Sequence, residues 1–166
     1  MGPGSLGLTL ATLSSGTRLS CNTQPNETRD PMPLITGFDH FVLTVSSIEE
    51  TCAFYGEALG VEVITFAGGR KALLCGDQKI NLHEAGREFE PKAAKPTPGA
   101  GDFCLVTEED LEVLAARLDR LGIVIEEGPV ARTGARGPIT SLYLRDPDGN
   151  LVEVARYDGQ VSGGDT

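Results

Sequence analysis

Two histidines and two carboxylates stand at positions where their side chains could share one face of a sheet. His40 opens an apolar segment, His83 closes another, Asp102 opens a third, and Glu153 interrupts a fourth. Imidazole nitrogens and carboxylate oxygens are the donors that divalent ions such as Mn, Fe, Ni and Zn accept. These four residues are therefore the candidate ligands of a metal ion.

Alternation along each expected strand sorts side chains between the two faces of a sheet. In residues 38–45 the apolar side chains Phe41, Leu43 and Val45 alternate, which leaves His40 on the opposite face. If the sheets curve, the opposite faces of the strands converge on a cavity; a solvent-exposed sheet face is the alternative. The polar residues sorted to that face are His40, Asn81, His83, Asp102, Ser141, Tyr143, Arg145 and Glu153.

Several of these residues have more than one expected role. His83 is a metal ligand, a general base or a cavity-lining group, because imidazole titrates near neutral pH. Asp102 is a ligand, a residue that orients a ligand by a hydrogen bond, or part of the turn before its strand. Glu153 is a ligand or has a polar partner, because a carboxylate in an apolar strand is costly to bury without a cation or a partner. With His83, it is an expected catalytic residue.

A guanidinium offers a fork to a carboxylate or phosphate, so arginines are candidates for holding an anionic substrate. Arg132 and Arg145 are the stronger candidates, and Arg136 is better interpreted as a surface residue in a salt bridge. The full set expected to bind substrate is Arg132, Ser141, Tyr143, Arg145 and Asn81.

A duplicated segment positions these residues. Residues 37–61 have a second copy 62 positions further on, which aligns His40 with Asp102 and Gly60 with Gly122 without a gap. Such a repeat indicates a structural unit that occurs twice. Each unit is expected to have the order β-α-β-β-β. The strands are expected at 38–45, 62–66, 71–75, 79–83, 102–107, 123–126, 140–145 and 150–157, with a helix from about 46 to 59 and another at 111–121.

Length and composition fit one globular domain with solvated ends. The chain has 166 residues, 40% of them hydrophobic. Residues 1–33 read as a disordered leader, an expression remnant or a transit peptide, and 159–166 as a disordered tail. The domain is expected at 34–158, with module one at about 35–84, a linker or lid at 85–100, and module two at about 101–158. Residues 128–138 are expected to be irregular.

Charge and cysteine usage narrow the partners and the compartment. A formal charge of −10 disfavours nucleic acid and anionic membrane, which would repel the chain. A small-molecule substrate is the expected partner. The four cysteines lack metal-site spacing, which favours the reducing cytoplasm, with organelle import through residues 1–33 as the alternative.

Motifs at both ends of the domain resemble a known superfamily. The segment from Asp39 to Val45, the pairs Phe54-Tyr55 and Leu59-Gly60, and the string from Asp146 to Glu153 closely resemble the vicinal oxygen chelate superfamily. That superfamily includes glyoxalase I, fosfomycin-resistance proteins and extradiol dioxygenases. Within it, residues 76–84, 89–93 and 128–135 are most similar to glyoxalase domain-containing protein 5 and its bacterial relatives.

The resemblance implies an α+β fold in which paired βαβββ modules form a U-shaped, cup-like mixed sheet around a divalent metal. His40 and Glu153 match the family's ligand positions, Asp102 stands where histidine or glutamine is usual, and Asn81 or His83 fills the remaining place. The resemblance also implies a homodimer.

The function implied is a metal-dependent, glyoxalase-like lyase or isomerase that acts on a small anionic metabolite. The metal would be Mn, Ni, Zn or Fe, and glutathione or another thiol is an expected co-substrate. The alternatives are an extradiol-type dioxygenase, a fosfomycin-resistance-type thiol transferase and a non-catalytic small-ligand cup.

Overall fold

A computed structural model describes residues 34–159. The expectations for residues 1–33 and for most of the tail lie outside the described part of the chain. Residues 37–159 form one compact unit. Within residues 34–159, no helix is long and apolar enough to cross a bilayer.

The first module runs β-α-β-β-β, as the repeat predicts. Its elements are β1 (His40–Val45), α1 (Ile48–Leu59), β2 (Glu62–Phe66), a short 3-10 turn (Ala67–Gly69), β3 (Arg70–Cys75) and β4 (Gln78–Glu84). The Ser47 side chain caps α1 by accepting a hydrogen bond from the Glu50 backbone N–H at 3.2 Å. Gly60 ends the helix with a φ of 68°, a left-handed conformation that glycine adopts without strain.

The second module repeats this order. It comprises β5 (Asp102–Val106), α2 (Leu111–Arg120), β6 (Ile125–Gly134), β7 (Gly137–Arg145) and β8 (Leu151–Tyr157). The expectation of an irregular stretch at 128–138 is wrong, because these residues form most of the β6–β7 hairpin. Pro129 is tolerated there since β6 is an edge strand, and Pro129 falls at a register shift between Glu127 and Val130.

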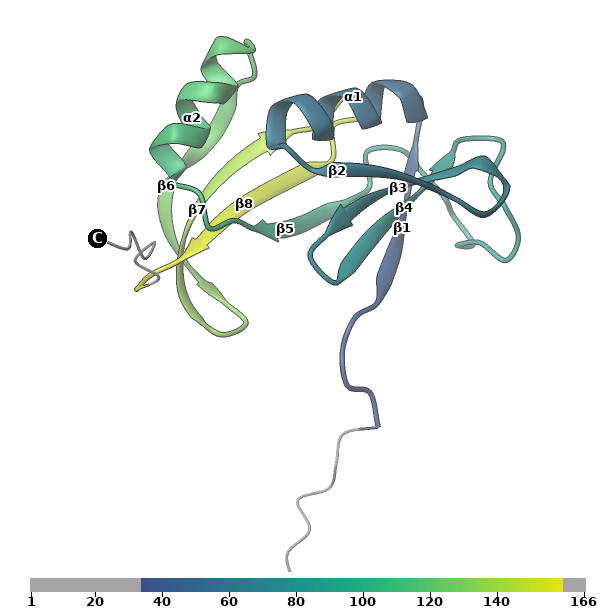
Figure 1. Cartoon of the computed structure of the whole chain (residues 1–166), viewed down its shortest axis with the longest axis horizontal. Helices are drawn as coiled ribbons and strands as arrows, with labels where there is room; N and C mark the ends of the chain where they lie inside the picture. Colours follow the sequence, from purple (N-terminus) through teal and green to yellow (C-terminus); the bar gives the residue numbers. More distant parts are fainter. Residues whose placement is uncertain (1–33, 160–166) are drawn as a thin grey trace, which may run out of the picture. The chain divides into compact units, whose positions relative to one another are not determined.

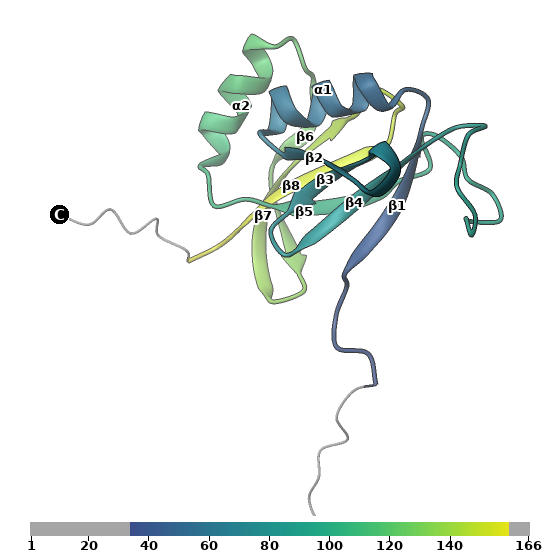
Figure 2. The same ribbon diagram turned by 45° about the vertical axis from the view of Figure 1, so that its right-hand side comes forward.

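Each module forms its own four-stranded mixed sheet (Figure 1). Sheet A has the order β1-β4-β3-β2, and sheet B the order β5-β8-β7-β6. In both, the first strand of the module pairs in parallel with the last, and the other neighbours are antiparallel. Figures 1 and 2 show α1 and α2 on the same side of the sheets. α1 packs on β2, β3 and β4, and α2 packs on β6.

The helix-facing sides of both sheets share one apolar core. The rings of Phe41 and Phe103, which are repeat partners, lie 5.4 Å apart between β1 and β5. A buried polar link also joins the modules, since the Tyr55 hydroxyl donates to Asp146 at 3.0 Å. The largest fully buried apolar side chains are Tyr55, Leu73, Ile80, Leu82, Leu118, Leu142, Leu144, Val45 and Val152.

Candidate functional site

The side of sheet A turned away from the helix is here called the polar face of sheet A. Parallel pairing places His40 beside Lys79 and Thr44 beside His83. The antiparallel β3–β4 pairing aligns Ala72 with Asn81. Since alternate residues share a face, the residues on this face are His40, Val42, Thr44, Glu62, Ile64, Phe66, Arg70, Ala72, Leu74, Lys79, Asn81 and His83.

The two imidazoles on this face differ in environment. The His40 side chain is 46% exposed, and its Nδ1 lies 2.5 Å from Asp39 Oδ1. This contact lowers the pKa of the Asp39 carboxyl, through the hydrogen bond first and the charge of His40 second. His83 is 8% exposed and meets the ring of Phe89 edge-on at 5.6 Å. Its ring nitrogens make no hydrogen bond within residues 34–159.

Asn81 adds an unused acceptor between these histidines. Its Oδ1 is buried and has no hydrogen-bond partner among the described residues. Buried polar atoms without a partner are rare and costly, and they often mark a place that a ligand or water fills. The polar face of sheet A is therefore equipped to bind something more than the chain itself.

The corresponding polar face of sheet B carries carboxylates. Register places Asp102 beside Leu151, and both Cys104 and Tyr143 beside Glu153. Ser141 donates to Glu153 at 2.5 Å. Partial burial, and then the charge of Glu153, raise the pKa of the Cys104 thiol to about 12. Cys104 is therefore a poor nucleophile near neutral pH. Asp102 is exposed and forms no hydrogen bond within the described chain.

The arginines predicted to hold an anion are engaged in ion pairs. Arg132 donates to Glu127 at 2.7 Å and to the Tyr143 hydroxyl at 3.2 Å. Arg145 pairs with Glu126 at 3.2 Å. The guanidinium of Arg136 instead covers the Tyr157 ring at 4.3 Å. An arriving anion would have to compete with a carboxylate for Arg132 or Arg145.

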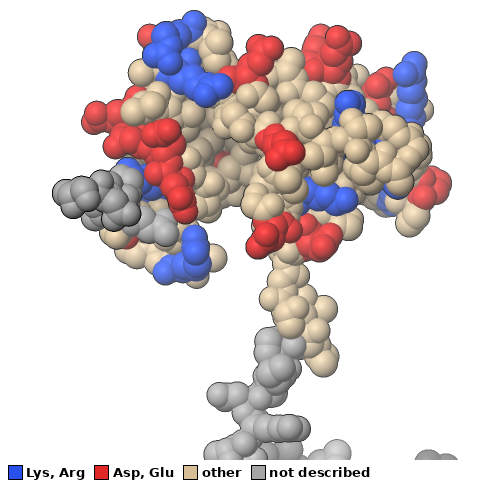
Figure 3. All heavy atoms as spheres, viewed as in Figure 1, with Lys and Arg blue, Asp and Glu red and all other residues tan. Residues whose placement is uncertain are grey.

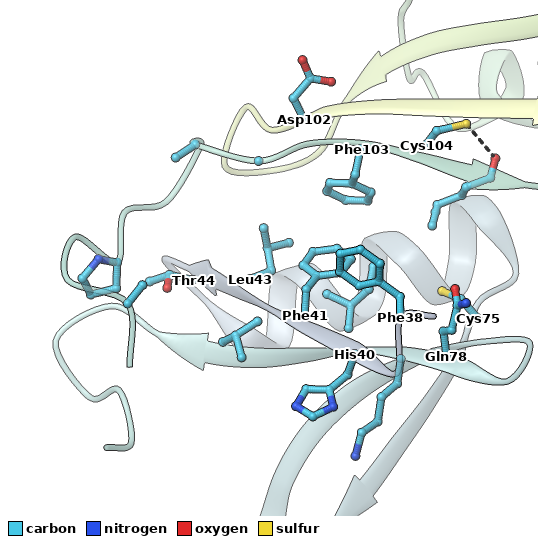
Figure 4. A pocket seen from close by; sticks show the side chains of 18 of the residues that line it. Phe38, His40, Phe41, Leu43, Thr44, Cys75, Gln78, Asp102, Phe103 and Cys104 are labelled. Atoms are coloured by element: carbon cyan, nitrogen blue, oxygen red, sulfur yellow. Dashed lines mark hydrogen bonds between the residues drawn. The ribbon is translucent and has the colours of Figure 1, made fainter. Parts of the chain in front are cut away.

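The two polar faces do not meet within one chain. A hollow of about 790 Å³ lies between the β1 and β5 sides, and its lining includes Phe41, Leu43 and Phe103 as well as His40 and Asp102 (Figure 4). In Figure 4, His40 and Asp102 point in opposite directions across this apolar layer. Glu153 is on the Asp102 side, since both share the polar face of sheet B. Within residues 34–159, no group of three or more His, Cys, Asp or Glu side chains could hold a metal.

Within residues 34–159 of one chain these residues therefore do not form a metal site, and the expectation that His40, His83 and Glu153 share one cavity stays a prediction. Alternation decides on which face of its own sheet a side chain lies. The direction in which that face looks depends on how the two sheets pack, and here the Phe41–Phe103 layer holds the faces apart.

The four donor residues still suit a divalent ion, but each sheet supplies only two of them. Sheet A offers His40 and His83, and sheet B offers Asp102 and Glu153. Nitrogen and carboxylate donors of this mixture suit Mn, Fe, Ni or Zn. One chain presents each half on a separate face.

Two cations of sheet A are absent from the sequence-based expectations. Arg70 and Lys79 lie on the face of the histidines, with their charges over the ring of Phe66 at 4.8 and 4.2 Å. Lys79 could have been found by its spacing of two from Asn81. Arg70 was not predicted to lie on this face because its strand was expected to begin one residue later. Figure 3 shows small groups of basic side chains among many acidic ones, consistent with the charge of −10.

Comparisons with known proteins agree with this fold. The model of the Glyoxalase/Bleomycin resistance protein/Dioxygenase superfamily matches residues 37–154. The chain is 52% identical over 124 residues to "Virulence protein STM3117" of Salmonella typhimurium. The alignment covers 75% of this chain and 86% of that protein. The crystal structure of that protein aligns with a TM-score of 0.72 over 75% of this chain and 99% of that one.

Two other relatives are more distant. "Glyoxalase domain-containing protein RDO1" of Mycosarcoma maydis is 49% identical over 123 residues, covering 74% of this chain and 69% of that protein. "Glutathione transferase FosA" of Serratia marcescens is 28% identical over 126 residues, covering 73% and 81%. The predicted fold class of paired βαβββ modules is thereby confirmed.

Proposed function

Because this chain belongs to the Glyoxalase/Bleomycin resistance protein/Dioxygenase superfamily, we propose that it is a divalent-metal-dependent, glyoxalase-like enzyme whose site is shared by two copies. In this proposal, the polar face of sheet A in one copy lies opposite the polar face of sheet B in the other. The substrate is a small anionic metabolite with neighbouring oxygens, and the reaction is of lyase or isomerase type.

The observation that carries the proposal is the division of the donor set. Two imidazoles lie on one face and two carboxylates on another, and an apolar layer separates them within the chain. Neither His83 nor Asp102 has a hydrogen-bond partner in the described residues. A second copy, turned so that unlike faces meet, would bring the two halves together with closed two-fold symmetry.

Exposed apolar side chains on the same two faces support this pairing. Val42 on sheet A is 46% exposed, and Val106 on sheet B is 53% exposed. Covering such residues is favourable, by roughly 25 cal/mol for each Å² of apolar surface removed from water. The apolar rims would hold the copies together while the polar centres remain available to substrate.

In the shared site, His40, Glu153 and Asp102 would hold the ion, with His83 as a further ligand or as the general base. A divalent ion bound there would act as a Lewis acid toward the substrate oxygens. Asp39 would orient the His40 ring through its contact with Nδ1, which leaves Nε2 free for the ion. Ser141 would orient the Glu153 carboxylate.

Mixed dimers test the sharing of the site. A differently tagged His40→Ala chain and Glu153→Gln chain are co-expressed, and dimers carrying both tags are purified. Such a dimer keeps one intact site when the site is shared, so it should bind about one metal ion, against about two in wild type. Metal content after Mn or Zn loading is measured by elemental analysis.

The matched control places both substitutions in one chain and pairs it with a wild-type chain. Each of the two shared sites then lacks one ligand, so this dimer should bind almost no metal. A site within one chain gives the reverse pattern, with metal in the control and none in the first mixed dimer, and that result would overturn the proposal. Circular dichroism and the dimer mass check that all chains fold.

The reaction itself is tested on the same samples with the adduct of methylglyoxal and glutathione. Isomerisation of the adduct by the first mixed dimer, and not by the control, supports the proposed glyoxalase-like activity. Binding of the adduct without turnover would favour the non-catalytic cup instead. The finer likeness to glyoxalase domain-containing protein 5 stays a prediction.

A further inference from the structure

The arginine beside His83 has a different environment from the arginines of sheet B. Arg70 is half-buried, and its Nε donates to the Ala67 carbonyl at 2.9 Å. Its guanidinium carbon lies 4.8 Å from the ring centre of Phe66 and 5.6 Å from that of Phe89. No carboxylate of the described chain pairs with it. Its two terminal nitrogens therefore keep their donors unused.

Lys79 is a second cation that forms no salt bridge in residues 34–159, although its charge contributes to lowering the pKa of the Asp39 carboxyl. Its Nζ lies 4.2 Å from the ring centre of Phe66, so the same ring supports both positive charges. In a chain with 24 acidic and 14 basic residues, an arginine that has no carboxylate partner and lies near a second cation is unexpected unless an anion from outside the chain joins them.

The linker residue Phe89 lies on the other side of the space around Arg70. The Phe89 ring contacts both Arg70 and His83. It is held there by the local fold of the linker, in which Glu88 accepts hydrogen bonds from the Gly86 backbone at 2.9 Å and from Lys92 at 3.0 Å. The Glu88 side chain is only 8% exposed.

We propose that Arg70 and Lys79, walled by Phe66 and Phe89, bind the carboxylate of a small hydroxy acid on the polar face of sheet A. The inference rests on the proposed function only in taking this face to line the substrate site. It replaces Arg132 and Arg145, which are paired with carboxylates of the chain, as the groups that hold the anion.

The geometry around the Arg70 guanidinium favours a carboxylate as its ligand. Aromatic rings lie against the guanidinium, and Nε is occupied, so the terminal NH groups remain as a fork. A fork of this kind matches the two oxygens of a carboxylate, and the flanking rings strengthen the attraction by excluding water. The buried Asn81 Oδ1 lacks a donor, which a hydroxyl of the ligand would supply.

Binding is measured by NMR titration of the full chain with EDTA present. The probes are L-lactate, methylphosphonate and lactamide, which compare a carboxylate, a phosphonate and a neutral amide. Lactate should shift the Phe89 and His83 ring signals saturably, with methylphosphonate weaker and lactamide inactive. Arg70→Gln should weaken lactate binding at least about tenfold, and Arg70→Lys less, because charge remains without the fork.

The matched control is Arg120→Gln, which removes the same charge from the last turn of α2. It should leave lactate affinity within about twofold. Phe89→Ala serves as a second variant and should also weaken binding. Equal affinity of wild type and Arg70→Gln, no shift at Phe89, or tighter binding of methylphosphonate than of lactate would overturn the proposal.

The titration and the mixed-dimer experiment can fail separately. Lactate binding is read without metal, so its loss alongside normal metal binding by the mixed dimer removes only the carboxylate site. Normal lactate binding with the reverse metal pattern removes only the shared metal site.

Discussion

Sheets A and B are built to the same plan but carry opposite chemistry on their polar faces. Both run parallel at their first and last strands, and His40 and Asp102 open equivalent strands. Sheet A presents two imidazoles and the cations Arg70 and Lys79, which form no salt bridge in residues 34–159, whereas sheet B presents carboxylates and arginines that are already paired. The duplicated scaffold has kept its topology while its two faces have become complementary.

This difference teaches that the halves of the repeat need one another for chemistry. Complementary charge guides association and fixes which faces meet, whereas two like faces would repel. Within one chain, the core between the modules satisfies only their apolar sides. The polar sides are left for a ligand, an ion or a second copy.

The largest effect is expected from breaking the link between the modules. Asp146 accepts hydrogen bonds from the Tyr55 hydroxyl, the Asp148 and Asn150 backbone N–H groups and the Asn150 side chain, at 2.7 to 3.0 Å. Asp146→Ala leaves buried donors unpaired and should lower the free energy of unfolding by about 3 kcal/mol or more. Urea denaturation followed by circular dichroism measures this loss.

Asp158→Asn is the control for that substitution. The exposed Asp158 accepts one side-chain hydrogen bond, from Thr140 at 3.0 Å, so its replacement should cost less than about 1 kcal/mol. A cost for Asp146→Ala as small as that of the control would show that the buried link does not hold the modules together.

A smaller effect should distinguish the thiols of the two sheets. The pKa of Cys104 is raised to about 12 by burial and by Glu153, whereas burial alone raises the pKa of Cys75. Glu153→Gln should therefore lower the pKa of Cys104 and speed its alkylation by iodoacetamide at pH 8 severalfold, because more thiolate is present.

Cys75 supplies the internal reference, since its alkylation rate should not change. Mass spectrometry of digested samples follows both sites. Unchanged reactivity of Cys104, or an equal rise at Cys75, would contradict the assignment of Glu153 to the Cys104 face.

The smallest effect concerns the linker that brings Phe89 to sheet A. Hydrogen bonds from the Gly86 N–H and from Lys92 lower the pKa of Glu88 to about 2. A carboxyl whose folded pKa is depressed stabilises the fold fully above its ordinary pKa of about 4.3, and this contribution is lost as the pH falls toward 2. The Gly86 amide signal of the folded chain should therefore be constant from pH 8 down to about pH 3 and move only as the pH approaches about 2.

Glu88→Gln should remove this acid transition at Gly86, because the side chain no longer titrates. The matched substitution Glu90→Gln should keep the acid transition at Gly86. The Glu90 Oε1 lies 3.8 Å from the Lys92 Nζ, and Glu90 makes no contact with Gly86. A Gly86 transition near pH 4 in wild type would argue against the linker geometry that positions Phe89.

Much of the fold could be predicted because its signals are local. The repeat placed the first strands, Ser47 and Gly60 marked the ends of α1, and alternation separated Phe41 and Leu43 from His40. The prediction failed at residues 128–138, where Pro129 suggested a loop. An edge strand with a register shift accommodates that proline, and a strand's place at the edge of its sheet is a tertiary property.

The candidate site was less predictable for the same reason. Arg132 was chosen for its residue type, but its pairing with Glu127 depends on strand register. Phe89 lies in a linker without periodicity, so no pattern placed it against Arg70 and His83.

By itself, the sequence determined the superfamily, the two modules and the face of its own sheet on which each polar residue lies. Those properties follow from motifs and from the two-residue period of strands, which act over short distances. Only the tertiary structure decided that the faces of His40 and Glu153 look away from each other, and which arginines are already paired. The packing of Phe41 against Phe103 sets those directions, because close-packed side chains from distant segments determine how two sheets meet.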